Sequence, residues 1–305
     1  MLVYLPIAEL PVNALLMLAL GGAVGFLSGM FGVGGGFLMT PMLIFAGVPS
    51  AVAVATGANP LIASSITGTI AQYRHKNVDI KLGMYMLAGG AGGALLGVQI
   101  VRYLRQAGQF DLTVSLLYVV FMSVIGGLML VESVRAIRKR RLGRPVTMRR
   151  PAQHNWVQRL PFKTRFKTSK LYISAAPAAG LGVVVGLLSG VMGVGGGFLM
   201  VPILIYILRV PTNIAIGTSL FQVIFVSAIT TVLQAVWNQT VDVALALILM
   251  TGGVAGAQAG ASAGQHLRAE QLRLLLAILV LAVGLRLFAG LFSPADLFSL
   301  SRAEA

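Results

Sequence analysis

The chain of 305 residues contains no cysteine and only 8 acidic residues. The lack of cysteine excludes disulfide bonds, thiolate catalysis and cysteine-ligated metal sites. Charged residues form 10% of the sequence, whereas soluble domains contain about a quarter. Hydrophobic residues form 57%, and the mean hydropathy is +0.89. This composition excludes an ordinary soluble protein.

Carboxylates are also missing from the middle of the long apolar stretches. Asp79, Asp111, Asp242 and Glu270 fall between these stretches, and Glu132 lies near the end of one. Cation carriers and proton relays usually place a carboxylate within the membrane. An intramembrane hydrolase or metalloenzyme would need carboxylate pairs, clustered histidines or a serine with a base. The sequence therefore predicts a protein that is not an enzyme, uses no cofactor or metal and does not carry a cation.

Apolar stretches of membrane-crossing length, about 17–25 residues, are abundant. They occupy residues 12–30, 50–72, 83–104, 113–134, 213–236, 243–266 and 272–292. The segment MLVYLPIAELPVN before the first stretch lacks the basic region of a cleaved signal, so we expect this stretch to be retained. The pattern predicts an all-α polytopic membrane protein with about eight transmembrane helices.

The net charge of +15 comes mainly from one segment, because 13 of the 23 Lys and Arg residues lie in 135–170. Short loops rich in Lys and Arg remain in the cytoplasm, so the charge does not require nucleic acid. We expect a first membrane repeat (1–134), a basic cytoplasmic connector (135–170) and a second membrane repeat (171–305). The connector can also contact anionic lipid headgroups, although setting the topology is sufficient reason for its charge.

The two apolar halves resemble each other. GFLSGMFGVGGGFLMTPMLIF at 25–45 and GLLSGVMGVGGGFLMVPILIY at 186–206 are identical at 15 of 21 positions. Matches continue downstream with shifts of one or two residues, pairing Thr56 with Thr218 and Gln72 with Gln234. The chain therefore contains an internal duplication.

Each repeat has a short apolar segment that cannot cross the membrane alone. Residues 37–48 would form about 18 Å of helix, against a hydrocarbon core of about 30 Å. The segment either continues the preceding helix, which gives parallel repeats, or folds back, which gives inverted repeats. Inversion places more basic loop residues inside and is favoured. It puts six inside (Arg74, Lys76, Lys81, Arg209, Arg268, Arg273) and three outside (Arg102, Arg105, Arg302).

A run of glycines precedes each short segment, GVGGG at 32–36 and again at 193–197. Unwound backbone at membrane depth is tolerated only where it is buried in protein or lines a cavity. Free N–H groups at the start of the following half-helix favour anions. Paired broken helices in two repeats also indicate a transporter's substrate site. We therefore predict a substrate site that includes Gly34, Gly35, Gly36, Gly195, Gly196 and Gly197.

Polar residues after each short segment extend this candidate site. The predicted substrate-binding residues are Thr56, Asn59, Gln72, Thr218, Gln222 and Gln234. The amides are costly to bury and favour a wet cavity or a ligand, whereas hydroxyls of Ser and Thr commonly bond to their own helix. The other glycines have the spacing of helix contacts, and we expect them to be packing residues. They are Gly89, Gly90, Gly92, Gly93, Gly97, Gly252, Gly253, Gly256 and Gly260.

The doubled GxxSGxxGVGGGFLMxP motif, at 25–41 and 186–202, and the segment ATGANP at 55–60 resemble the sulfite exporter TauE/SafE family of membrane transporters. The resemblance implies a multi-pass inner-membrane protein that moves small sulfur-containing anions, such as sulfite or organosulfonates. Relatives tend to carry Gln where this chain has Pro60, and Gln222 occupies the matching place in the second repeat. The leading function is a secondary transporter and exporter of small anions in the lipid bilayer. An anion channel and a non-transporting membrane scaffold are the alternatives.

Overall fold

A computed structural model describes residues 2–31, 35–141, 163–166, 168–169, 171–208, 210–264 and 269–292. The first half contains β1 (Leu2–Leu5), β2 (Leu10–Asn13), α1 (Ala14–Phe31), α2 (Gly36–Phe45), α3 (Ser50–Gly57), α4 (Asn59–Arg74), α5 (Ile80–Gln106) and α6 (Phe110–Arg141). The second half contains β3 (Lys163–Phe166), β4 (Leu171–Ser174), α7 (Ala175–Met192), α8 (Gly197–Tyr206), α9 (Thr212–Leu233), the π-helix η1 (Gln234–Asn238), α10 (Val243–Gly264) and α11 (Ala269–Phe292). Most of the predicted connector, residues 142–162, and predicted Gly34 lie outside the described residues.

The prediction of an all-α polytopic membrane protein is confirmed. Six helices in the described part of the chain, α5, α6, α7, α9 with η1, α10 and α11, are long and apolar enough to cross a bilayer. Large apolar side chains remain exposed on them, including Leu128 (67%) and Leu285 (69%). Such side chains on the outside of a helical bundle are suited to lipid.

The predicted span 50–72 is not one helix. It is divided into α3 and α4, which end and begin at Gly57 and Asn59. Pro60 lies in the first turn of α4, where its missing N–H would have no helical acceptor. A proline inside a continuous helix would remove a hydrogen bond and clash with the preceding turn, so the chain begins a new helix here.

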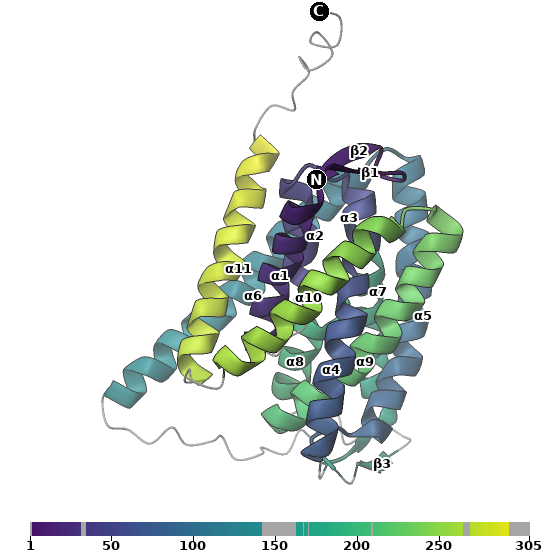
Figure 1. The fold of residues 1–305 in the computed structure, drawn as a ribbon. Coiled ribbons are helices and arrows are strands. Elements are labelled where there is room, and N and C mark those ends of the chain that lie inside the picture. Colours follow the sequence, from purple (N-terminus) through teal and green to yellow (C-terminus); the bar gives the residue numbers. More distant parts are fainter. Residues whose placement is uncertain are drawn as a thin grey trace, which may run out of the picture.

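Two β-hairpins, which the sequence analysis did not predict, precede the two sets of helices. In the first hairpin, β1 pairs antiparallel with β2, with Leu2 opposite Asn13. In the second hairpin, β3 pairs antiparallel with β4, with Lys163 opposite Ser174. The two hairpins lie at opposite ends of the bundle, and α2 and α8 lie toward the ends that carry the first and second hairpin, respectively (Figure 1).

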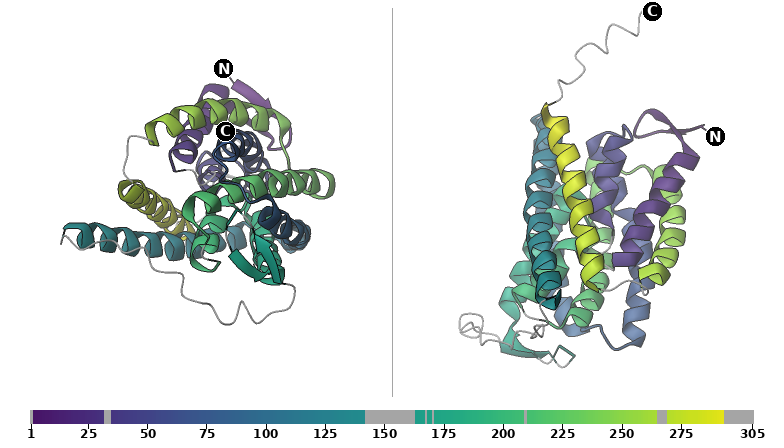
Figure 2. Two further views of the ribbon diagram at one scale, coloured as in Figure 1. Left: turned by 90° about the horizontal axis from the view of Figure 1, so that it is seen from below. Right: turned by 90° about the vertical axis from the view of Figure 1, so that its left-hand side faces the viewer.

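The helices pack mainly in four pairs. All four join a helix of the first half of the chain to a helix of the second half, and two of them, α1 with α10 and α5 with α7, we call the exchanged pairs. The others are α4 with α9 and α6 with α11. Helices α6 and α11 run side by side along one flank of the bundle (Figure 2). Each repeat of the duplicated sequence therefore packs mainly against the other repeat.

Glycines bring the exchanged pairs into backbone contact, which largely confirms the predicted packing residues. A Cβ atom at Gly89 or Gly93 would overlap the carbonyl oxygens of Ala179 or Val183 on α7. Equivalent overlaps at Gly252, Gly256 and Gly260 involve Leu18, Gly22 and Phe26 on α1. The prediction was wrong for Gly92, beside which the space is open.

Candidate substrate site

The N-terminal ends of the half-helices α2 and α8 meet inside the bundle. Phe37 and Phe198, the second residues of these helices, stack with ring centroids 4.1 Å apart and planes inclined by 21°. A Cβ atom at Gly36 would collide with the carbonyl oxygen of Val194 in the other break. The two predicted glycine breaks are thus brought together.

The second break is unwound in a manner that requires glycine. Gly193, Gly195 and Gly196 have φ angles of 70°, 69° and 77°. This left-handed region is costly for residues that carry a Cβ atom. Gly193 also ends α7, because its left-handed conformation turns the chain out of the helix after its N–H has donated to the carbonyl oxygen of Ser189 at 2.8 Å. The repeated glycines are therefore needed to turn the chain from α7 into α8.

The first break differs in its described part. Gly35 has an ordinary φ of −59°. Its N–H donates to Ser28 Oγ at 2.7 Å. Ser189 stands at the matching position of the second repeat, and its buried hydroxyl has no hydrogen-bond partner. The donor groups of the second break are therefore more available than Gly35 N–H is.

Several hydrogen-bond donors around the second break have no partner within the described residues. The N–H groups of Gly197, Phe198 and Leu199 open α8, and the first helical bond in this turn is made by Met200. Ser227 on α9 is fully buried and its hydroxyl is unpaired. A Cβ atom at Gly195 would lie 2.8 Å from Ser227 Oγ, so this hydroxyl borders the break. Buried polar groups normally have partners, and this collection of free donors is suited to an anion.

The electrostatic potential at the site also favours an anion. Two helix N-termini meet there, each with partial positive charge. The buried carboxylates in the described part of the chain, Asp79 and Asp242, belong instead to the starts of α5 and α10. No group of three or more possible metal ligands occurs in the same part. The described residues at the breaks therefore include no carboxylate that would favour a cation over an anion.

Leu61 lies against both breaks, whereas Gln222 is buried against α5. Leu61 is 2% exposed, and its Cδ1 atom occupies the space beside both Gly36 and Gly195. Gln222, also 2% exposed, donates from Nε2 to the carbonyl oxygen of Met86 at 3.3 Å and leaves Oε1 unpaired. Pro60, at the matching position on α4, lies against Gly253. Leu61 therefore limits the space at both breaks, and Val223, at the matching position of the second repeat, lies 3.5 Å from the position of a Cβ atom at Gly195.

The remaining predicted residues are engaged in structural bonds. Thr56 and Thr218 accept backbone N–H bonds from Asp242 and Asp79, both at 3.1 Å. Asn59 donates to the carbonyl oxygen of Thr56, in the turn that precedes it. These three residues therefore support the helix ends.

Gln72 and Gln234 each accept a bond from an asparagine, Asn77 at 2.9 Å and Asn238 at 2.6 Å. Gln234 also donates to the carbonyl oxygen of Gly190 at 3.1 Å. Both amides thus fix loops and helix contacts near the ends of α4 and α9.

Sequence reasoning missed Ser28, Ser189 and Leu61. The two serines lie inside the duplicated GxxSGxxGVGGG motif, so their repetition was a signal that could have identified them. Leu61 carries no such signal, because its contact with both breaks depends on how α4 packs.

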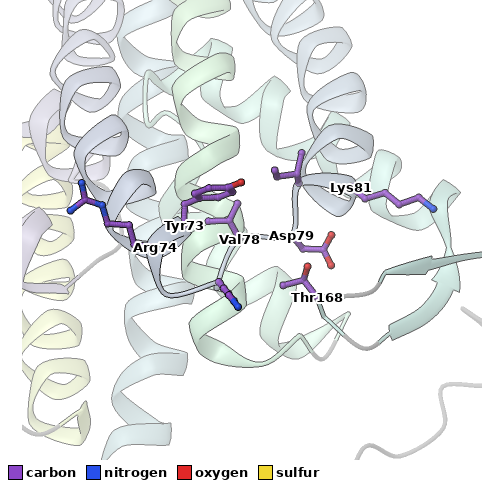
Figure 3. Close-up of a pocket in the computed structure, with 8 residues that line it drawn as sticks. Tyr73, Arg74, Val78, Asp79, Lys81 and Thr168 are labelled. Carbon is purple, nitrogen blue, oxygen red and sulfur yellow. The ribbon is translucent and has the colours of Figure 1, made fainter.

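A separate pocket of about 710 Å³ lies at the end of the bundle that carries the second hairpin (Figure 3). It is lined by Tyr73, Arg74, Lys76, Val78, Asp79, Ile80, Lys81 and Thr168. Arg74 and Lys81 lie on opposite sides of it, whereas Asp79 is turned toward Thr168 (Figure 3). The carboxylate of Asp79 accepts bonds from Leu82 N, Ser169 N and Ser169 Oγ. Three cations therefore surround a pocket whose single carboxylate is already bonded to neutral donors.

The sequence is similar to several membrane proteins. It is 27% identical over 288 residues to the probable membrane transporter protein YunE of Bacillus subtilis, covering 91% of this chain and 98% of that protein. It is 32% identical over 255 residues to a probable membrane transporter protein of Xylella fastidiosa strain 9a5c, covering 81% and 85%. A shorter match, 30% over 123 residues, is to the sulfite exporter TauE/SafE family protein 3 of Arabidopsis thaliana, covering 39% and 26%.

No solved structure matches the chain. The profile of the family described as Sulfite exporter TauE/SafE matches residues 17–287, which include both glycine breaks and the long apolar helices up to the last turn of α11. This is a family of membrane transporters and not of enzymes. The chain therefore belongs to the sulfite exporter TauE/SafE family of multi-pass membrane transporters.

Proposed function

We propose that this protein is a secondary transporter that exports a small sulfur oxyanion or organosulfonate across the inner membrane. The observation that supports this most strongly is the meeting of two half-helix N-termini beside unpaired donors at the second break. Backbone N–H and hydroxyl groups replace the water around an anion without adding a counter-charge. The name of the matched family adds support for a sulfur-containing substrate.

We infer that the two repeats are inverted in the membrane. The hairpins that precede α1 and α7 lie at opposite ends of the bundle (Figure 1). Together with the basic segment 135–170, this supports a cytoplasmic location for the end with the second hairpin. An inverted pair of broken helices gives each side of the membrane an equivalent route to one site.

Export is supported by the different basic content of two matching loops, the second of which is contacted by Arg105 through its bond to the carbonyl oxygen of Asn238. The pocket at the second hairpin carries Arg74, Lys76 and Lys81, whereas the matching segment WNQTVDVA at 237–244 has no basic residue. A basic opening raises the local concentration of anions and their rate of capture. In the proposed orientation, anions are collected from the cytoplasm.

The first test is flux in proteoliposomes that contain the purified full chain. We expect saturable efflux of sulfite, thiosulfate or a small alkyl sulfonate, and no flux of a cation such as ammonium or sodium beyond protein-free vesicles. A channel would give flux that does not saturate over the same range. Cation flux without anion flux would contradict the proposal, as would the absence of any flux from correctly inserted protein.

A further inference from the structure

The two exchanged helix pairs have the same construction. Along α1 and α10, the contacts of Gly21, Gly25 and Gly29 fall successively on Leu249, Gly253 and Ala257. Both helices therefore run in the same direction and touch through their backbones. Along α5 and α7, Gly89, Gly93 and Gly97 fall successively on Ala179, Val183 and Leu187. Such close backbone contact leaves little room for one helix to slide on the other.

A buried aspartate joins the start of each pair to a hairpin. Asp242 accepts from Leu245 N at the start of α10 and from Ile7 N in the first hairpin, both at 3.1 Å. Asp79 accepts from Leu82 N at the start of α5 and from Ser169, which lies between β3 and β4. The distances to Ser169 N and Oγ are 3.0 and 2.7 Å. Each carboxylate therefore bonds a helix of one half to the hairpin of the other half.

Each hairpin leads directly into the helix that packs against the aspartate-capped helix of the same pair. β2 ends at Asn13 and α1 begins at Ala14, while β4 ends at Ser174 and α7 begins at Ala175. Leu5 in the first hairpin is completely buried in the main apolar core. The hairpin is consequently a strap across the start of the pair, fixed by Leu5 and by the carboxylate.

Contacts at the breaks themselves are more local. The stacked rings of Phe37 and Phe198, and the side chain of Leu61 beside Gly36 and Gly195, provide much of the packing there. Backbone meets backbone at single points, where a Cβ atom at Gly36 would overlap the carbonyl oxygen of Val194 and one at Gly193 that of Val54. The glycine contacts within a pair instead recur over several turns of both helices. Movement is therefore easier between the pairs than within them.

We propose that Asp79 and Asp242 are positioning residues that strap the α5–α7 and α1–α10 pairs, so that each pair moves as one body while the breaks separate. The proposal rests on the transport function proposed above. Each moving body then contains one helix from either repeat. Asp79 and Asp242 contact helix starts and hairpins and lie away from the breaks, and Asp79 also lines the pocket of Figure 3.

Hydrogen–deuterium exchange of the full chain in nanodiscs tests the straps without requiring transport. Asn in place of Asp can cap the helix through one oxygen but cannot accept the hairpin bonds at the other position. We expect Asp79→Asn to speed exchange in 163–174 by about tenfold, the effect of losing a bond to a charged acceptor, and to leave 2–13 unchanged. Asp242→Asn should have the reverse pattern. Unchanged exchange in both variants would overturn the proposal, whether or not the parental protein transports anions.

Crosslinking tests whether the strap remains closed during transport, because the chain has no native cysteine. Asp79→Cys with Ser169→Cys should transport at less than half the parental rate when reduced. A short thiol crosslinker should restore the rate. The matched control is Phe37→Cys with Phe198→Cys, in which a crosslink across the breaks should stop the flux that remains in the reduced protein.

Loss of flux when the introduced thiols at positions 79 and 169 are crosslinked, with reduction restoring it, would show that the hairpin must open and would overturn the proposal. Equal flux in reduced and crosslinked forms at the parental rate would also overturn it, since the strap would then have no role in transport. Absence of flux in the parental protein would contradict the proposed function instead, and the exchange experiment would still decide whether the carboxylates hold the hairpins.

Discussion

The backbone N–H of Asp242 donates to Thr56 Oγ1 at 3.1 Å and connects the start of α10 to α3. In the other half of the molecule, Asp79 N–H donates to Thr218 Oγ1 at the same distance and connects the start of α5 to α9. Both threonines are at most 1% exposed. A matched pair of residues that the sequence assigned to the substrate site thus supports two helix starts.

Replacing Thr56 or Thr218 with Val should lower stability without weakening substrate binding. Valine preserves the shape of the side chain but leaves a buried N–H without an acceptor, at a cost of about 1–3 kcal/mol. Thermal unfolding in detergent and the KM for anion flux measure the two effects. Thr67→Val is the control, because the Thr67 hydroxyl is exposed and bonds to its own helix at Ala63. A higher KM with unchanged stability would indicate that Thr56 or Thr218 binds substrate.

The serines of the two breaks should respond differently to removal of their hydroxyl groups. Ser227→Ala and Ser189→Ala remove unpaired buried hydroxyls, so stability should be unchanged or slightly higher. Anion affinity should fall by about tenfold, or about 1.4 kcal/mol, as expected for one hydrogen bond to a charged ligand. Anion-dependent thermal stabilisation measures this loss.

Ser28→Ala is the matched control for these variants. It removes the acceptor of Gly35 N–H, so it should lower stability by about 1–2 kcal/mol. Its effect on anion affinity should be smaller than that of Ser227→Ala. Equal affinity losses in both repeats would mean that the two breaks contribute equally to the site.

The sequence contained enough information to predict the helices and the glycine contacts. Apolar length indicated the spans, and the spacing of Gly89, Gly93 and Gly97 indicated a packing face that the structure confirms. These features are local, since they depend on helix periodicity and on the size of one residue. The duplicated glycine run also indicated the two breaks that the structure brings together.

The sequence did not indicate which helices the glycines contact. α5 packs on α7 and α1 on α10, and such contacts between distant segments leave no periodic pattern. Asp79 and Asp242 appeared to be ordinary loop residues, because their role depends on hairpins that arrive from the other half of the chain. The sequence also does not show which polar partner a buried side chain meets, so the bonds of Thr56, Thr218, Gln72 and Gln234 could not be predicted.

Changing the size of residue 61 should change which anions are transported. Leu61→Ala removes the side chain that fills the space beside both breaks, so larger sulfonates should gain in kcat/KM relative to sulfite. Leu61→Phe should reduce flux of every anion, because the site has no room for a larger ring. The cost of the Ala variant is about 2–5 kcal/mol of stability, so flux must be normalised to folded protein. Leu128→Ala, on the lipid-exposed side of α6, should leave selectivity unchanged.

Removing the charge of the pocket in Figure 3 should slow the capture of anions from that end. The combined Arg74→Gln, Lys76→Gln and Lys81→Gln variant should raise the KM for efflux by about tenfold, within the range of electrostatic steering, with kcat little changed. The parental KM should rise with salt, because screening shortens the reach of charges to about 10 Å at 0.1 M. The variant should lose most of this salt dependence. Arg102→Gln, an exposed change toward the other end of α5, should behave as the parental protein does, and an equal effect there would mean that overall charge, not the pocket, governs capture.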